Sequence, residues 1–326
     1  MTTYFVRRLL GSIPVLLLTS VVIYALVAAQ PGDPIDAYRA DPQFTAEDEA
    51  RLRRALGLDQ PIFLRYLAWM GQALSGNFGY SQTYGEPVFK YVFDIALPRT
   101  LLLSGTALLF ALIVSIPVGI YSASRQYSAT DYVVSLLTFV GFSTPVFWLG
   151  IMLIYLFAVA LPGALPAGGF ASPWVSIEVD GWWAYISDRL RHLILPAFTL
   201  GALSMAVWTR FMRASMLEVI SQDYIRTARS KGLAERVVIF KHAFRNAVLP
   251  IVTLLGLAIP GVLGGAIITE RVFAWPGMGS AIIAALVNKD YNVVMVALGF
   301  LAIIVVVANL FVDVVYALVD PRIRYG

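Results

Sequence analysis

The sequence predicts an all-α polytopic membrane protein with six transmembrane helices. The first observation is the composition: hydrophobic residues make up 59% and charged residues 13% of the 326 residues, against roughly 45–50% and about 25% in an ordinary soluble domain. A soluble core of this size cannot hide so much apolar surface, whereas a lipid bilayer can. The second observation is that the apolar residues form blocks of about twenty residues between charges, the length that a helix needs to cross the hydrocarbon core.

Six such blocks lie between the charged positions. The third begins at Tyr132 and is expected to end near Leu161, because Pro162 and the glycines after it interrupt the run. The fourth meets Arg210 and Arg213 in its last turns, so we expect this helix to project beyond the membrane. The predicted spans are 9–29, 100–124, 132–161, 192–213, 246–269 and 291–312.

The first block also has features of a secretory signal, since Arg7 and Arg8 precede an apolar run that ends at Val27-Ala28-Ala29. Signal peptides usually have an apolar run of roughly 7–15 residues, and this run has about twenty. We therefore expect the first helix to be retained rather than cleaved.

The distribution of Lys and Arg predicts the orientation of the chain. Positions 210 to 245, between the fourth and fifth spans, hold eight basic and three acidic residues, a local excess of 8 − 3 = +5. Basic pairs also flank the outermost spans, Arg7 and Arg8 before the first and Arg322 and Arg324 after the last. Because basic residues in short loops stay in the cytoplasm, both termini and the basic segment are predicted to be cytoplasmic.

The largest piece outside the membrane is expected at residues 30–98, on the outer face. Residues 46–56 predict a short amphipathic helix with acidic residues early and arginines late, which suits the helix dipole. Residues 61–73 predict a second, more apolar helix. The chain is thus divided into the N-terminus with the first span at 1–29, an extracytoplasmic cap or docking platform at 30–98, and a core with five spans at 99–326.

Residues that the sequence lacks exclude several kinds of chemistry. There is no cysteine, no Gly-x-x-x-x-Gly-Lys-Ser/Thr phosphate loop, and neither His192 nor His242 lies in a His-Glu-x-x-His pattern. Ser143 lacks the second glycine of a nucleophile turn and an activating histidine, so residues 141–145 are expected to bend or tightly pack the third span. The chain is predicted to be no enzyme and to bind no cofactor, metal or nucleic acid.

The spans also lack ionisable residues near their centres, which a proton- or sodium-coupled carrier usually needs. A stand-alone channel or carrier is therefore the weaker alternative. We expect a partner to deliver the energy for any transport.

The cytoplasmic loop 218–246 contains a pattern of two short helices. The first runs to Lys231 and is expected to end at Gly232, since glycine suits a helix C-terminus with positive φ. The second runs from about Ala234 to Asn246 and leads into the fifth span, with Pro250 one turn inside it. Two short helices joined at a glycine form an elbow that can fit a groove of a cytoplasmic partner. The alternative is a basic loop that only sets the topology, because it would have the same composition.

Several motifs resemble one family, the membrane-embedded permease subunits of ATP-binding-cassette importers, in the branch that carries dipeptides, oligopeptides and nickel. Arg226-Thr227-Ala228 stand at the Glu-Ala-Ala positions of the family signature, with Gly232 at its glycine and Leu249-Pro250 beyond. The Glu of that signature is missing, which puts the ion pair made by other branches in doubt. Other stretches agree with the peptide branch: 7–10 with Pro14, 31–34, 55–59, 76–81 and 273–279.

The resemblance implies a type I importer permease fold in the plasma (inner) membrane of a prokaryote. It implies a second related permease subunit, two cytoplasmic ATPase subunits that bind ATP and Mg²⁺, and an extracytoplasmic solute-binding (lipo)protein. This chain would form half of the path for di- and oligopeptides; nickel, glutathione, haem or another solute is the alternative within the family. The residues implied to couple to the ATPase are Asp223, Tyr224, Ile225, Arg226, Thr227, Ala228, Arg229, Lys231 and Gly232.

The loop at 162–191 is the second candidate site. It begins with Gly, Pro and Ala, and its tryptophans Trp174, Trp182 and Trp183 are expected at the outer headgroups. One interpretation is an interfacial segment that leads back into the fourth span. The other is that residues 162–170 reach into the docked binding protein, with contacts by Pro162, Gly168, Gly169 and Phe170.

Overall fold

The structure is a computed structural model that describes residues 2–319 except 33–34, 36–38, 40–42 and 56. Three predictions fall partly or wholly outside these residues: the Asp33-Pro34 end of the 31–34 motif, Leu56 at the end of the first outer helix, and the C-terminal pair Arg322 and Arg324. Within the described residues the chain is helical apart from one short hairpin and the connecting loops.

The chain forms two units, and the first comprises residues 1–99 and 276–307. Its core joins Val88, Val92 and Ala96 to apolar residues of two segments far along the chain, 278–285 and 293–297. Its hairpin pairs Tyr80 with Pro87 and Ser81 with Glu86 in antiparallel register. Its elements are α1 Thr2–Ala28, α2 Ala46–Ala55, α3 Ile62–Leu74, β1 Tyr80–Ser81, β2 Glu86–Pro87, α4 Val88–Lys90, η2 Tyr91–Ala96, α13 Met278–Val287 and the first part of α14 Tyr291–Val319.

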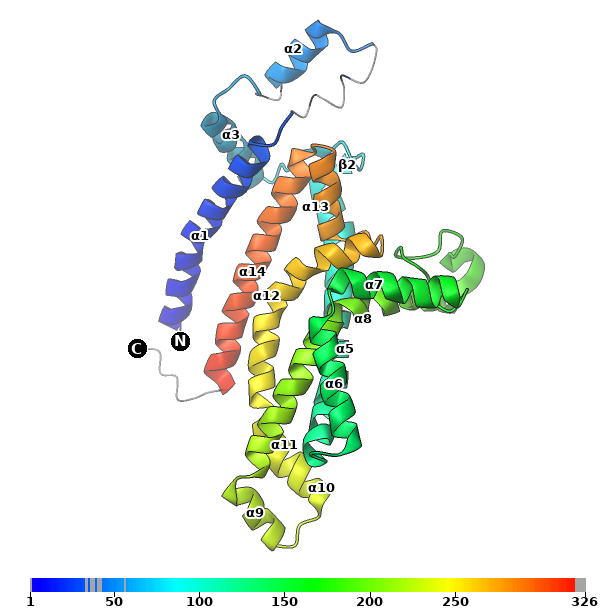
Figure 1. The fold of residues 1–326 in the computed structure, drawn as a ribbon. Coiled ribbons are helices and arrows are strands. Elements are labelled where there is room, and N and C mark those ends of the chain that lie inside the picture. Colours follow the sequence, from blue (N-terminus) through cyan, green and yellow to red (C-terminus); the bar gives the residue numbers. More distant parts are fainter. Residues whose placement is uncertain (1, 33–34, 36–38, 40–42, 56, 320–326) are drawn as a thin grey trace. The chain divides into compact units, whose positions relative to one another are not determined.

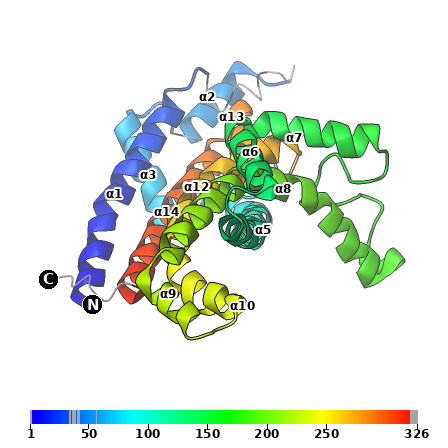
Figure 2. The same cartoon turned by 60° about the horizontal axis from the view of Figure 1, so that its bottom comes forward.

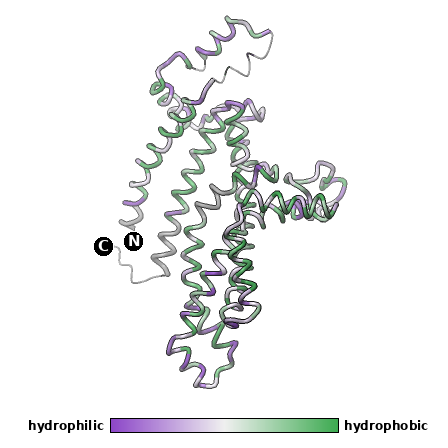
Figure 3. The backbone as a smooth tube through the Cα atoms, in the orientation of Figure 1, coloured by the Kyte–Doolittle hydropathy of each residue, from purple (hydrophilic) through white to green (hydrophobic). Residues whose placement is uncertain are grey.

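The second unit comprises residues 100–275 and the end of α14. Its core lies along α8 and gathers buried residues such as Trp208, Met212 and Met216. The hydropathy of the backbone separates its parts: the long helices are mainly apolar, and α9 with the turn that follows it is mainly polar (Figure 3). Its elements are α5 Leu97–Ser124, α6 Ala129–Ser143, α7 Val146–Ile154, η3 Tyr155–Ala160, α8 Ile177–Ile220, α9 Asp223–Ser230, α10 Glu235–Val237, η4 Val238–Ala243, α11 Phe244–Ala247 and α12 Leu249–Val272.

The predicted all-α fold with six spans is confirmed when each bent helix pair is counted as one span. Four described helices are long and apolar enough to cross a bilayer on their own. Two further spans consist of a bent pair each, α6 with α7–η3 and α10–α11 with the first part of α12. By length and composition, the candidate spanning stretches are Arg7–Ala28, Val88–Ser124, Ile177–Ile220, Tyr291–Leu310, 129–160 and 235–258. The first part of the last stretch overlaps the predicted cytoplasmic loop 218–246.

The third span is not one straight helix. Its two halves meet at an angle of 106° between Ser143 and Val146. Thr144 is extended (φ −85°, ψ 123°) because Pro145 after it excludes the helical conformation. Gly141 also allows a close approach to α8, since a Cβ there would lie 3.3 Å from the Cβ of Ala206. The expected bend and tight packing at 141–145 are both present.

Helix α8 begins at Ile177 with one turn before a break at Gly181, and its continuous part starts at Trp182, before the predicted start near His192. Ser176 caps this earlier start, because its side chain accepts a hydrogen bond from the Val179 N–H and its own N–H donates to Asp180 Oδ2 at 3.0 Å. Gly181 interrupts the helix with φ 80° and ψ 167°. The last part of the predicted 162–191 loop is therefore helical.

Candidate functional site

The elbow at residues 223–247 projects from the end of α8, and both views of the ribbon show it there (Figures 1 and 2). The first helix, α9, ends at Ser230, with Lys231 as its C-cap and Gly232 at φ 75°. This is the left-handed C-terminus expected from the glycine. The Gly232 N–H donates to the Arg229 carbonyl at 2.9 Å, which closes the turn. Both predicted short helices are present, and the second continues through η4 and α11 to α12.

Two side chains hold α9 on the rest of the unit. Ile225 and Ala228, three residues apart on one face, are 0% and 7% exposed and belong to the same core as Val238 and Ala243 of η4. Residues three apart share a helix face. Asn246 Nδ2 also donates to the Tyr224 hydroxyl at 2.8 Å, which ties the start of α9 to α11. Ile225 and Ala228 are thus anchors inside the protein, a distinction that the sequence pattern alone did not make.

The other predicted coupling residues lie on the outer face of the elbow. Arg229 donates from Nε and Nη2 to both carboxylate oxygens of Glu235 (3.2 and 2.7 Å), which fixes the two arms to each other. This bond raises the pKa of the Arg229 guanidinium. The exposed members of the predicted set are Asp223, Tyr224, Arg226, Thr227, Arg229, Lys231 and Gly232.

The second arm of the elbow bends where it joins α12. The axis of 235–247 and that of 249–258 differ by 44°. Pro250 lies in the first turn of α12, where its missing N–H costs no hydrogen bond. The two arms of the elbow therefore end in two different spanning helices, α8 and α12, so a displacement of α9 acts on both.

The loop at 162–191 is fastened to the segment before α13 at residues 168–170. The Gly169 N–H donates to the Phe273 carbonyl at 2.8 Å, and a Cβ on Gly168 would lie 2.3 Å from the same oxygen. The Phe170 ring meets the Trp275 ring edge-on, with centroids 5.2 Å apart. Of the four predicted contact residues only Pro162 is exposed, and the other three are half-buried. The structure brings Gly168, Gly169 and Phe170 together as a packed base, and separates Pro162 from them.

The same 162–191 stretch exposes large apolar side chains. Trp174, Trp182 and Trp183 are 79%, 64% and 75% exposed, and Val179 lies among them in sequence with 83% exposed. Such side chains suit the interface between headgroups and hydrocarbon, where an apolar ring meets a wet surface.

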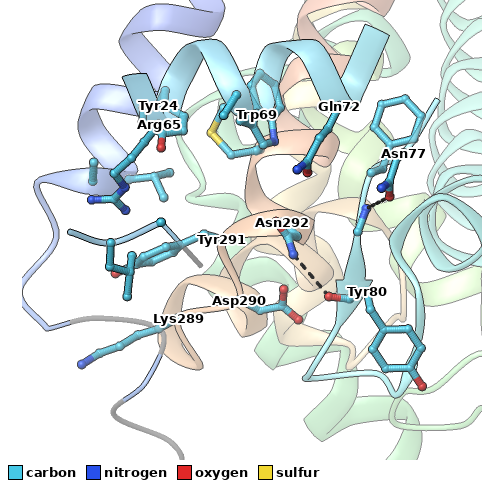
Figure 4. A pocket seen from close by; sticks show the side chains of 18 of the residues that line it. Tyr24, Arg65, Trp69, Gln72, Asn77, Tyr80, Lys289, Asp290, Tyr291 and Asn292 are labelled. Atoms are coloured by element: carbon cyan, nitrogen blue, oxygen red, sulfur yellow. Dashed lines mark hydrogen bonds between the residues drawn. The ribbon is translucent and has the colours of Figure 1, made fainter. Parts of the chain in front are cut away.

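The first unit has a pocket of about 270 Å³ lined by α1, α3, the hairpin and the start of α14 (Figure 4). Asp290 at its edge is buried and accepts hydrogen bonds from the Ser81 hydroxyl (2.6 Å) and the Thr83 N–H (3.0 Å). Asn292 Nδ2 donates to the Tyr80 carbonyl at 3.4 Å. These bonds hold the hairpin on α14. No group of three His, Asp or Glu side chains placed to hold a metal occurs in the described part of the chain.

Two further buried carboxylates, like Asp290, were not singled out from the sequence. Asp131 pairs with Arg213, 82 positions away, and Glu270 accepts a hydrogen bond from the Thr100 hydroxyl at 2.6 Å. Both partners are distant in sequence. The only available signal was the position of each carboxylate at the edge of an apolar block.

Comparison with known proteins agrees with this architecture over the whole chain. The family described as the inner membrane component of binding-protein-dependent transport systems matches residues 115–325, and the N-terminal family of the same membrane components matches residues 1–104. These matches confirm the predicted type I importer permease fold.

Relatives of similar length match this chain from end to end. The oligopeptide transport system permease protein AppB of Bacillus subtilis is 42% identical over 326 residues, with 100% of both chains covered. The di/tripeptide transport system permease protein DppB of Pseudomonas aeruginosa is 39% identical, covering 100% of this chain and 99% of the relative. The dipeptide transport system permease protein DppB of Escherichia coli is 38% identical with the same coverage. The chain belongs to the family of inner membrane components of binding-protein-dependent transport systems.

Proposed function

We propose that this chain is the transmembrane subunit of an ATP-driven importer and forms half of the path for di- and oligopeptides delivered by a solute-binding protein. The observation that carries this proposal is the similarity of about 40% over the full length to several permeases named for peptide transport. The bent spans line part of the path for the peptide. The cytoplasmic elbow is the place where the ATPase acts on this subunit.

ATP hydrolysis is assigned to partners. The sequence contains no phosphate loop. We assign the binding of ATP and Mg²⁺ to two cytoplasmic ATPase subunits. A second, related permease completes the path, and an external solute-binding (lipo)protein supplies the peptide. The basic segment sets the orientation: both termini and the elbow are cytoplasmic, and residues 30–98 lie outside.

The elbow is the docking element for one ATPase. Its anchors Ile225 and Ala228 keep α9 on the permease. Its outer face presents polar and basic side chains, such as Arg226 and Lys231, to a cleft of the ATPase. When ATP draws the ATPases together, α9 moves with its cleft, and α8 and α12 pass the movement to the membrane. A ligand can shift a conformational equilibrium only through different contacts with the two states.

The outer loop contacts the binding protein through its exposed end. Pro162 and the residues after it form the contact, while Gly168, Gly169 and Phe170 hold the base of the loop in place. The Arg191 Nη2 group supports this arrangement because it donates to the Gly163 carbonyl at 2.6 Å. The residues of the base therefore act on the contact indirectly.

Uptake assays in cells test which solute the importer carries. A strain without this chain should lose uptake of a labelled dipeptide and regain it when the chain is restored. The same strain is assayed with labelled nickel, glutathione and haem. Restored uptake of one of these and not of peptides would overturn the assignment of peptides while leaving the importer intact.

Exchange of the external binding protein tests where specificity lies. We expect most of the specificity outside this chain, because no ionisable residue lies near the centre of a predicted span. Pairing the importer with a binding protein of different peptide preference should redirect uptake. Uptake that keeps its original preference would place the selectivity in the path.

A further inference from the structure

Asp131 is a buried carboxylate at which three segments of the second unit meet. It is 3% exposed and lies in the first turn of α6. The Ser122 hydroxyl of α5 donates to its Oδ1, and the Tyr127 N–H of the α5–α6 turn donates to its Oδ2 at 3.0 Å. Arg213 of α8 donates to the same two oxygens from Nε and Nη2 at 2.7 and 2.8 Å. One side chain thus ties α5, α6 and α8 together.

The geometry of this pair is specific. An arginine that donates from two nitrogens to both oxygens of a carboxylate is held in one plane, so the pair fixes orientation as well as distance. Tyr127 also has φ 64°, a conformation that is rare for a residue with a side chain, and its N–H is bonded to Asp131. The carboxylate therefore also fixes the shape of the turn between α5 and α6.

A second close contact lies beside this pair. A Cβ on Gly119 of α5 would lie 2.6 Å from the Cβ of Met212, the residue before Arg213. Met212 is fully buried. Helices α5 and α8 therefore touch backbone to side chain next to the ion pair, which leaves them no room to slide freely past each other.

The pair lies on the helix that leads directly to the elbow. From Arg213 to Ile220, α8 is unbroken, seven residues or about 10 Å of helix at 1.5 Å per residue. Only Ser221 and Gln222 separate its end from α9. A force on α9 therefore reaches Arg213 through a short stiff connection.

We propose that Asp131 and Arg213 form a permanent clamp that makes the α5–α6 turn move as one body with α8 and α9 during transport. The inference rests on the proposed docking of α9 to an ATPase. Without the clamp, α8 would still follow the ATPase, but α5 and α6 would lag behind. Both residues position the helices and neither contacts the transported peptide.

A clamp that transmits movement and a pair that only stabilises the fold predict different results when the pair is broken. A pair that only stabilises the fold would, when broken, lower the yield and the melting temperature and leave peptide transported per ATP unchanged in the surviving complexes. A clamp that transmits movement affects this ratio directly. Asp131→Asn keeps the size of the side chain but removes the charge. Arg213→Lys keeps the charge but removes the two-armed geometry.

The experiment uses the complete importer in nanodiscs and measures ATP hydrolysed and peptide transported in the same sample. For Asp131→Asn we expect about a tenfold loss of peptide transported per ATP, within the 5–150-fold range typical of coupling between sites. Arg213→Lys should fall between wild type and Arg213→Gln. The matched control is Arg210→Gln, an exposed arginine one turn earlier on α8 for which the described residues provide no hydrogen bond or ion pair; its ratio should equal that of wild type.

A cross-link separates a permanent clamp from a pair that opens in each cycle. The chain contains no cysteine, so Asp131→Cys with Arg213→Cys supplies the only thiols of this subunit for a short bifunctional reagent. Transport by the cross-linked double variant should recover relative to the same variant without reagent. Continued loss, or a further loss on cross-linking, would overturn the clamp, as would an unchanged ratio in Asp131→Asn. If the wild-type complex itself shows no ATP hydrolysis linked to peptide, the proposed function fails instead.

Discussion

Gly168 lies so close to Phe273 that a Cβ atom on residue 168 would be 2.3 Å from the carbonyl oxygen of residue 273. The neighbouring Gly169 N–H donates to that same oxygen. Backbone therefore meets backbone at the base of the outer loop, and no side chain fits between them. This contact fixes where the exposed end of the loop begins.

Gly168→Ala should destabilise the protein, because the Phe273 oxygen belongs to the backbone and cannot turn aside. We expect a loss of about 1–3 kcal/mol, the usual cost of forcing extra volume into a packed site. Thermal unfolding of the purified chain in detergent measures it. Gly105→Ala is the control, since that glycine is helical with open space around its Cβ position. Equal melting temperatures for Gly168→Ala and wild type would contradict the contact.

Substitutions of Gly232 should act through the backbone alone. Its φ is 75° and nothing lies within 4 Å of the position that a Cβ would take, so a new side chain meets strain and no clash. Alanine should cost about 1–2 kcal/mol and valine more, while asparagine tolerates this conformation better. ATPase recovered with a tagged chain should therefore fall in the order glycine, asparagine, alanine, valine. Recovery that follows side-chain volume instead would point to direct contact at this position.

Ile225 and Arg226 are neighbours with different roles, so alanine at each position should impair a different property of the elbow. Ile225→Ala removes the fully buried anchor of α9 and should cost about 2–5 kcal/mol of local packing. The elbow should then be cut faster by protease. Arg226→Ala removes an exposed side chain and should weaken ATPase binding with no change in protease sensitivity. Similar digestion of both variants would refute the division into anchor and contact face.

Asp290→Ala should loosen the hairpin of the first unit. The carboxylate accepts hydrogen bonds from the Ser81 hydroxyl and the Thr83 N–H and also caps α14 through the Val293 N–H. Loss of a helix cap alone costs about 0.5–2 kcal/mol. Hydrogen exchange should accelerate in residues 80–87 and in the first turn of α14. Ser81→Ala, which removes one donor, should show a smaller effect at the hairpin only; unchanged exchange in Asp290→Ala would show that these bonds do not hold it.

The sequence predicted what depends on local pattern. Uncharged blocks of about twenty residues predicted six spans, and the described helices supply up to six when each bent pair counts as one. The fifth candidate, 235–258, overlaps the predicted 246–269 only in part. Gly232 predicted the end of α9 because only a positive φ stops the helix in that way. Both features are decided by neighbouring residues, and both are present.

Other features depend on contacts between distant residues and were missed. The bend after Ser143 was expected, but its angle of 106° was not, because the packing partners set it. The helix at 278–287 was not predicted, since ten apolar residues are too few to span and suit several structures. The pair Asp131 and Arg213 joins positions 82 apart, a distance at which one sequence carries no signal.

Whether ATP hydrolysis by a partner is linked to peptide binding outside the membrane tests the account most directly. The complex that co-purifies with a tag on this chain is placed in nanodiscs, and its ATP hydrolysis is measured with and without a peptide-loaded solute-binding protein. Hydrolysis that rises with the loaded binding protein is the predicted result. A chain that purifies alone and without ATPase activity, from cells that also express the partner subunits, would contradict the account and favour a stand-alone channel or carrier.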